Sequence, residues 1–182
     1  MISLKRFHSL SGATLMVSMV AGAMLAPHGV SASSRSSVEA RNHDIVSAAF
    51  ARWSAGSTSF FSDILAPEVV WTIEGSGPSA GVYRGRDEFI ERAVQPFASR
   101  LKTAVKPVRK SVWADGDHVI INWEGEGQAR DDQNYANSYL WIFRMDEGRA
   151  VEVKAFLDLV PYDEVIRRIP QRQPSERPSA RR

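Results

Sequence analysis

The strongest constraint on the fold is a series of four strand-like segments in the second half of the sequence. Their apolar side chains fall at alternate positions, which is typical of strands with one buried face. Short turns rich in Asp and Gly separate them, and such turns join neighbouring strands antiparallel. Strands this long twist strongly, so we expect a curved sheet. They are expected at residues 103–114, 118–129, 134–145 and 149–160.

Helical segments precede these strands. Ser36 and Glu39 have the spacing of a capping box, in which Ser36 is the N-cap and Glu39 reaches back to it. Apolar residues then recur at helical spacing as far as Trp53, and Gly56 is expected to end this first helix.

Four further elements complete the predicted order. We expect a short second helix stopped by Pro67, a strand at Val69–Glu74, a third helix near Asp87 that Pro96 bends or ends, and a last helix starting at Pro161. Residues 75–81, GSGPSAG, are expected to form a loop. Helices followed by a run of hairpins predict an α+β fold with three helices in the N-terminal half, a mixed or antiparallel sheet and a short C-terminal helix.

The N-terminus has the layout of a secretory signal peptide. Lys5 and Arg6 precede an almost uncharged segment at residues 10–26, and Val30-Ser31-Ala32 offers small residues to a signal peptidase. We therefore expect cleavage after Ala32 and export to the periplasm or beyond, with no membrane attachment of the mature chain. A membrane anchor is the alternative for this segment.

The charge of the chain does not indicate a nucleic-acid partner. The sequence has 23 basic and 21 acidic residues, and loss of Lys5 and Arg6 with the signal leaves the two in balance. Part of the remaining basic charge lies in residues 170–182, which have no apolar face. We expect this tail to be disordered.

Several kinds of chemistry are excluded or unsupported by the residue types. The chain has no cysteine, which excludes disulfides, thiolate metal sites and thiol nucleophiles. Once the signal is removed, His43 and His118 are the remaining histidines, and neither has acidic neighbours at metal-ligand spacing. No Gly-rich loop has the context of a dinucleotide site. We expect neither a metal nor a cofactor.

Two long strings resemble a known family. They are VVWTIEGSGPSAGVYRGRDEF and INWEGEGQARDDQNYANSYLWIFRMDEGRAVEVKAFLD. Both are similar to SnoaL-like, ketosteroid-isomerase-related proteins of the nuclear-transport-factor-2-like superfamily. The resemblance covers residues 42–169 and leaves 33–41 as an N-terminal extension. It implies a cone in which the sheet wraps over the helices, a pocket between them, and often a homodimer packed through the sheets.

Strand parity and the resemblance together select the residues expected inside the cone. Alternate residues of a strand share a face. A three-residue turn at Asp146–Gly148 would place Tyr139 opposite Ala155, and a slip of one residue would invert the faces. The residues expected to contact a ligand are Ile121, Trp123, Asn137, Tyr139, Trp141, Val153, Ala155 and Leu157.

Glu74 and Tyr139 are the candidate catalytic residues that the resemblance implies. Glu74 matches the position of the general base of the isomerases, where an apolar setting raises the pKa of a carboxylate. Tyr139 lies near their donor to the enolate oxygen. A solvated glutamate at a strand end and a core tyrosine bonded to the backbone are the alternatives.

Three positions depart from the enzymes of the family. Ala49 stands where the isomerases carry a tyrosine, and Ala155 where related hydrolases and cyclases carry an aspartate. Asp158 resembles a second family acid, but its parity favours a helix cap or an ion pair. We therefore expect an exported protein that binds a small apolar molecule. The alternative is a cofactor-free isomerase or cyclase that transfers a proton on an apolar carbonyl compound.

Overall fold

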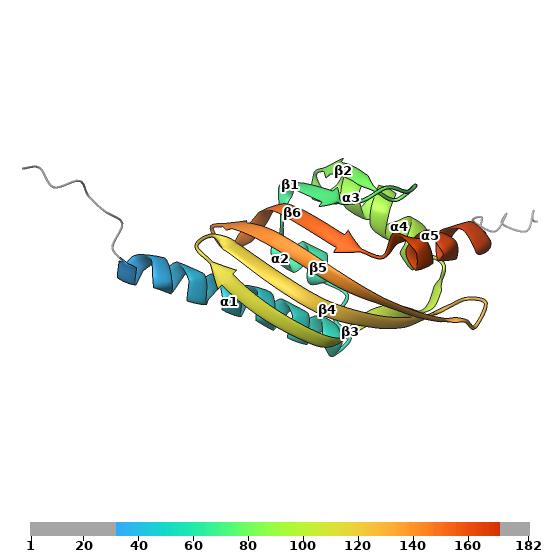
Figure 1. Ribbon diagram of the computed structural model, residues 1–182, viewed down its shortest axis with the longest axis horizontal. Coiled ribbons are helices and arrows are strands. Elements are labelled where there is room, and N and C mark those ends of the chain that lie inside the picture. The colour runs from blue at the N-terminus through green and yellow to red at the C-terminus, as the bar shows by residue number, and fades with distance from the viewer. Residues whose placement is uncertain (1–31, 172–182) are drawn as a thin grey trace, which may run out of the picture.

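A six-stranded sheet forms the centre of the protein in the computed structural model, which describes residues 32–171 (Figure 1). The strand order is β2-β1-β6-β5-β4-β3. β1 and β6 are parallel, and every other neighbouring pair is antiparallel. The predicted signal peptide, apart from Ala32, and residues 172–182 lie outside the described residues. The strands are β1 (Leu65–Ile73), β2 (Gly81–Arg84), β3 (Leu101–Asp115), β4 (His118–Ala129), β5 (Asn134–Asp146) and β6 (Arg149–Leu157).

Helices cover one face of this curved sheet and flank one end of it. The long α1 lies along β3 and β4 (Figure 1). The predicted α+β class and the predicted wrapping of the sheet over the helices are confirmed. The helices are α1 (Ala32–Ser54), α2 (Phe60–Ile64), α3 (Arg86–Phe89), the π-helical turn η1 (Ile90–Val94), α4 (Gln95–Ala98) and α5 (Leu159–Arg168).

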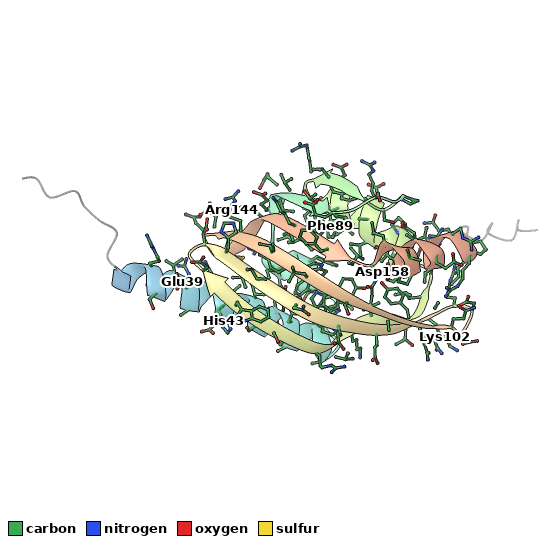
Figure 2. The ribbon with its side chains drawn as sticks, viewed as in Figure 1. Glu39, His43, Phe89, Lys102, Arg144 and Asp158 are labelled. Carbon is green, nitrogen blue, oxygen red and sulfur yellow. The ribbon has the colours of Figure 1, made fainter. Side chains whose placement is uncertain are left out.

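The first helix begins earlier than the capping box predicted. It starts at Ala32, so Ser36 lies inside the helix and is not its N-cap. The carboxylate of Glu39 instead accepts a hydrogen bond of 2.9 Å from the backbone N–H of Gly116, in the β3–β4 turn (Figure 2). The predicted end is correct. Gly56 has a φ of +103°, and Ser57 N–H bonds the Arg52 carbonyl, which closes the helix as a Schellman motif.

Two predicted boundaries around the first strands are wrong. Pro67 does not stop α2, because the helix ends at Ile64 and β1 starts at Leu65. The register of β1 on β6 shifts between Leu65 and Val70, and this irregularity accommodates the proline, which cannot donate to a strand ladder. The short strand β2 was not predicted. It pairs Tyr83 with Trp71, and the tyrosine is buried.

The third helix contains an irregular turn just before Pro96. α3, η1 and α4 run continuously, and the π-type turn η1 precedes the proline, which lacks an N–H for the helix ladder. The hydroxyl of Tyr162 in α5 donates a 2.9 Å hydrogen bond to the Ala93 carbonyl in this turn. The segment then ends at Ala98, close to where Pro96 was expected to end it.

The β5–β6 hairpin has a different register from the predicted one but the same faces. Its turn has two residues, Glu147 and Gly148, both with positive φ, so Asp146 pairs with Arg149. A further register shift of one residue between Arg144 and Met145 places Tyr139 opposite Leu157, not Ala155. The displacement is two residues, which is one full period of a strand, so every side chain keeps its predicted face.

β6 is shorter than predicted. It ends at Leu157, and α5 begins at Leu159 rather than at Pro161. The Asp158 side chain accepts a 2.9 Å hydrogen bond from the Val160 N–H and thereby caps α5. The interpretation of Asp158 as a helix cap is confirmed.

Candidate ligand pocket

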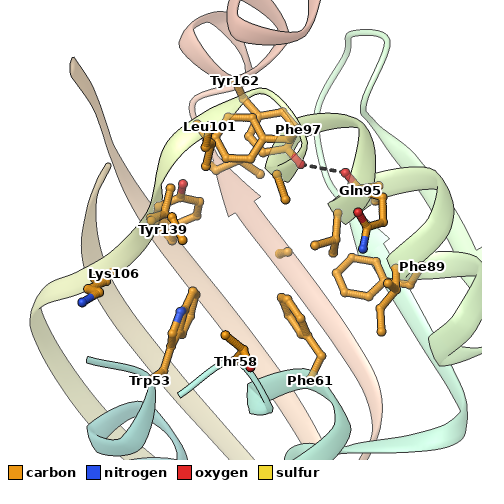
Figure 3. A pocket seen from close by; sticks show the side chains of 18 of the residues that line it. Trp53, Thr58, Phe61, Phe89, Gln95, Phe97, Leu101, Lys106, Tyr139 and Tyr162 are labelled. Carbon is orange, nitrogen blue, oxygen red and sulfur yellow. Dashed lines mark hydrogen bonds between the residues drawn. The ribbon is translucent and has the colours of Figure 1, made fainter. Parts of the chain in front are cut away.

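A pocket of about 650 Å³ lies between the helix-covered face of the sheet and the helices (Figure 3). The sheet contributes Trp123, Tyr139 and Trp141 to its wall. The segment between α1 and α2 closes one side, and α3, η1 and α4 close another. The wall is largely aromatic and aliphatic, which is typical of sites for small organic molecules. The helical part of the wall includes Trp53, Phe61, Phe89, Ile90, Val94 and Phe97.

Aromatic rings hold the shape of this wall. Trp123 and Tyr139 stack with centroids 3.9 Å apart and planes 7° apart. This stack requires Gly125, because a Cβ there would lie 2.6 Å from Trp123 and 2.7 Å from Val105. On the opposite side Trp71 stacks on Phe89 at 4.1 Å. Contacts of this kind fix the rings in place, so the pocket is preformed rather than assembled by a ligand.

The polar side chains of the wall are hydroxyls, the amide of Gln95 and two lysines. Within the described part of the chain, no Asp or Glu lines this pocket. Lys102 and Lys106 lie at its edge, and Lys102 forms an ion pair with Asp132. The buried indole N–H groups of Trp71 and Trp123 have no acceptor among the described residues. The wall therefore offers hydrogen-bond donors and positive charge, together with neutral hydroxyl and amide acceptors.

A buried hydrogen-bonded group lies behind the Tyr139 side of the wall. The Tyr135 and Tyr139 hydroxyls are 2.8 Å apart, and Asn137 Nδ2 donates to the Tyr135 hydroxyl at 2.9 Å. Burial raises the pKa of Tyr139 well above its usual value and raises the pKa of Tyr135 to about 12. Both hydroxyls therefore stay protonated at neutral pH.

The pocket contains five of the eight residues expected to contact a ligand. Ile121 and Val153 are fully buried on the same face but do not line it. Asn137 is buried and borders a second, small hollow with Glu124 and Asp158. Whether any of these residues contacts a ligand stays a prediction. The five in the wall are Trp123, Tyr139, Trp141, Ala155 and Leu157.

Glu74 and Tyr139 are not brought together in this pocket. Glu74 is half-buried just beyond β1, where its backbone N–H donates to the Ala155 carbonyl at 2.9 Å, and it does not line the pocket. Ala49 is a buried core residue outside the wall. A catalytic role for Glu74 stays a prediction.

The part of the wall that lies outside the sheet was missed by sequence reasoning, as was Tyr135. Helical spacing did indicate apolar faces around Phe61 and Phe89. Such spacing cannot tell a side chain that packs in the core from one that borders an empty space. Tyr162 was missed as well, although it lies within the last helix both as predicted and as observed.

The described part of the chain has neither a membrane-spanning helix nor a metal-binding cluster. Across residues 32–171, none of the helices is long and apolar enough to cross a membrane. The same stretch of chain holds no cluster of three or more His, Asp or Glu side chains suited to a metal ion.

Solved structures with this fold are numerous but distant in sequence. Bal32a, from a soil-derived mobile gene cassette, has a TM-score of 0.59 and 18% identity over 70% of this chain and 98% of its own. A protein named as a SnoaL-like polyketide cyclase from Jannaschia sp. CCS1 has a TM-score of 0.57 and 17% identity, covering 73% of this chain and 96% of its own.

TerC, co-crystallised with polyporic acid, also has a TM-score of 0.57 and 17% identity, over 70% of this chain and 98% of its own. No curated protein sequence matches the chain significantly. The model of the SnoaL-like domain matches residues 46–153, which include β1 to β5, the first half of β6 and most of the pocket wall. The chain therefore belongs to the SnoaL-like domain family and has the nuclear-transport-factor-2-like fold.

Proposed function

We propose that this protein binds a small apolar organic molecule in the pocket and does not depend on catalysis for its role. The observation that carries the proposal is the preformed aromatic pocket of about 650 Å³, whose described wall has no carboxylate. A proton-transfer enzyme of this family type needs a base beside the ligand, and Glu74 does not line the space where a ligand would lie.

The charge of the pocket favours a neutral or acidic ligand over an amine. Lys106 has no ion pair with a described residue. Its Nζ lies beside Gly56, another residue of the pocket wall, at 3.7 Å from the position that a Cβ would take there. An ammonium in that position disfavours a cationic ligand and attracts an anionic group at the pocket edge. TerC, which shares the fold, was co-crystallised with polyporic acid, a further reason to test small acidic organic compounds.

Ligand co-purification tests this proposal. We expect mass spectrometry of solvent extracts from the purified protein to identify a small apolar compound in stoichiometric amount. Ala155→Leu should reduce its yield, because Ala155 lines the pocket and a larger side chain would occupy part of it. Lys154→Leu, one residue away on the opposite face, is the matched control. A compound retained equally by both variants would place the ligand elsewhere.

A proton-transfer enzyme is the second candidate, and the protonated hydroxyl of Tyr139 in the pocket wall favours it. In that reaction Glu74 would remove a proton next to a carbonyl and Tyr139 would stabilise the enolate oxygen. Glu74→Gln and Tyr139→Phe would then lower turnover by about 10²-fold, with little change in affinity. Under the binding proposal both variants change affinity modestly and no turnover exists to lose.

The cellular setting of this function is also a proposal. The N-terminal layout supports export with cleavage after Ala32, which would leave a chain starting at Ser33. N-terminal sequencing of the exported protein tests it, and an intact Met1 would reject it.

A further inference from the structure

The hydrogen bonds around Asn137 have a fixed direction. Its Oδ1 accepts from two backbone N–H groups, those of Ser138 at 2.8 Å and Asp158 at 3.2 Å. An N–H can only donate, so the amide oxygen must point toward both of them. The amide nitrogen then points the other way, where it donates to the Tyr135 hydroxyl at 2.9 Å and to the Asp158 carbonyl at 2.8 Å.

This orientation determines how the two tyrosine hydroxyls share their protons. The Tyr135 oxygen accepts from Asn137, and its only other hydrogen bond among the described residues is with the Tyr139 hydroxyl, 2.8 Å away. If Tyr139 donated to Tyr135, the Tyr135 proton would be left without an acceptor in a buried place away from the pocket. Donation from Tyr135 to Tyr139 avoids this cost.

The proton of Tyr139 then has no acceptor among the described residues. Tyr139 lies in the pocket wall, as Figure 3 shows. The raised pKa values of Tyr135 and Tyr139 keep both protons in place at neutral pH. The acceptor for Tyr139 must therefore come from water or from a ligand in the pocket.

We propose that Asn137 and Tyr135 are positioning residues that fix the Tyr139 hydroxyl as a donor, so that the pocket selects apolar ligands with an acceptor oxygen, such as aromatic ketones. This inference rests on the proposed binding function. It goes beyond that function because it assigns the ligand a chemical group and places the origin of selectivity in two residues outside the pocket wall.

A matched pair of probes tests the selectivity. Fluorene and 9-fluorenone have the same three fused rings, and they differ in a methylene group and a carbonyl at one position. Quenching of tryptophan fluorescence gives the affinity of each probe for the purified protein. We expect 9-fluorenone to bind about five- to tenfold more tightly than fluorene, which corresponds to one net hydrogen bond.

Variants locate the source of the difference. Tyr139→Phe should lower the affinity for 9-fluorenone to that for fluorene, and Tyr135→Phe should lower it partly. Tyr83→Phe is the control, since that buried hydroxyl bonds the Ser79 carbonyl and does not line the pocket. Equal binding of both probes to the wild-type protein would overturn the inference and leave the binding proposal intact. Binding of neither probe would overturn both.

Asn137→Asp tests the direction of the hydrogen bonds that run from Asn137 through Tyr135 to Tyr139. A carboxylate at this position keeps the two backbone N–H bonds, loses the bond to the Asp158 carbonyl, and accepts from Tyr135 instead of donating to it. The chain then reverses, Tyr139 donates to Tyr135, and the pocket loses its donor. At pH 8 the variant should lose the preference for 9-fluorenone and keep its affinity for fluorene. An unchanged preference would show that Asn137 does not set the direction.

The infrared carbonyl band of bound 9-fluorenone reports directly on a hydrogen bond from Tyr139. The band would not shift if Tyr139 only supported the structure of the pocket. A hydrogen bond from Tyr139 lowers the stretching frequency relative to that in an apolar solvent. We expect the lowered band in the wild-type protein and in Tyr83→Phe, and its loss in Tyr139→Phe. A band at the apolar-solvent frequency in the wild-type protein would contradict the inference even if the probe binds.

Discussion

Ala155 lies at a position of the pocket wall where the surroundings restrict which side chain the protein can hold. Ala155 is 1% exposed and lies opposite Trp141 on β5 and Ile73 on β1. An aspartate at this position would therefore lie between apolar cross-strand partners. The described pocket wall has no carboxylate of its own. This position separates the chain from relatives of the hydrolase and cyclase type, for which the family resemblance implies an aspartate.

Ala155→Asp should therefore destabilise the protein. We expect the free energy of unfolding to fall by roughly 3 kcal/mol or more, because the carboxylate would be buried without a partner. Denaturant unfolding at pH 8 measures it, and Lys154→Asp on the exposed face is the control. If the two variants lose equal stability, position 155 does not face an apolar interior.

At the junction between β6 and α5, Asp158 both caps the helix and bonds the Asn137 side chain behind the pocket wall. The Asp158 side chain caps α5, and its backbone N–H and carbonyl bond the Asn137 side chain. α5 in turn contributes Tyr162 to the pocket wall. One residue thus links the last helix, the donor network and the pocket.

Asp158→Ala should cost about 1 kcal/mol of stability, since it removes the cap but keeps the backbone bonds to Asn137. Asp158→Asn retains a capping oxygen and should restore most of the loss. Thermal unfolding of the three proteins checks this prediction. Equal destabilisation by both substitutions would mean that the charge of Asp158, rather than its capping bond, stabilises the helix.

The β5–β6 hairpin shows what the sequence could and could not predict at this scale. Alternation indicated both strands and assigned Tyr139, Trp141 and Ala155 to one face, which the structure confirms. The pairing was wrong by two residues. One residue comes from the turn, whose length depends on which residues adopt positive φ, and the other from the register shift between Arg144 and Met145. Glu147 adopts positive φ here, although a non-glycine residue pays a cost for that conformation.

The whole molecule has a second apolar surface, on the sheet face that the helices leave uncovered. Trp113 is 53% exposed, and the register aligns it with Ile120 and Ile142 across β3, β4 and β5. Phe156 on β6 is 42% exposed. Apolar side chains gathered on one face are typical of an interaction surface. We propose that this surface forms the homodimer that the family resemblance implies.

Light scattering tests the dimer. We expect twice the chain mass at micromolar concentration, and Trp113→Asp should shift the mass toward that of the monomer by placing a charge in the contact. Val160→Asp, which changes an exposed apolar residue of α5 outside this surface, should have a smaller effect. A wild-type protein that scatters as a monomer would refute the proposal.

At the scale of the molecule, the fold was easier to predict than the site. Element order and a family resemblance were enough for the cone, whereas the pocket depends on how two halves of the chain meet. Trp53 and Phe61 from the first half line one cavity together with Trp141 and Leu157 from the second. No local pattern shows which apolar residues border the cavity rather than fill the core, and none shows that Glu74 lies outside it.

The indole N–H signals of the five tryptophans give the most direct test of ligand binding in this pocket. Trp53, Trp71, Trp123 and Trp141 line it, whereas Trp113 lies on the uncovered face of the sheet. Titration of the ¹⁵N-labelled protein with 9-fluorenone should shift the signals of the first four and leave that of Trp113 in place. A shift confined to Trp113, or no shift at saturating probe, would contradict the account.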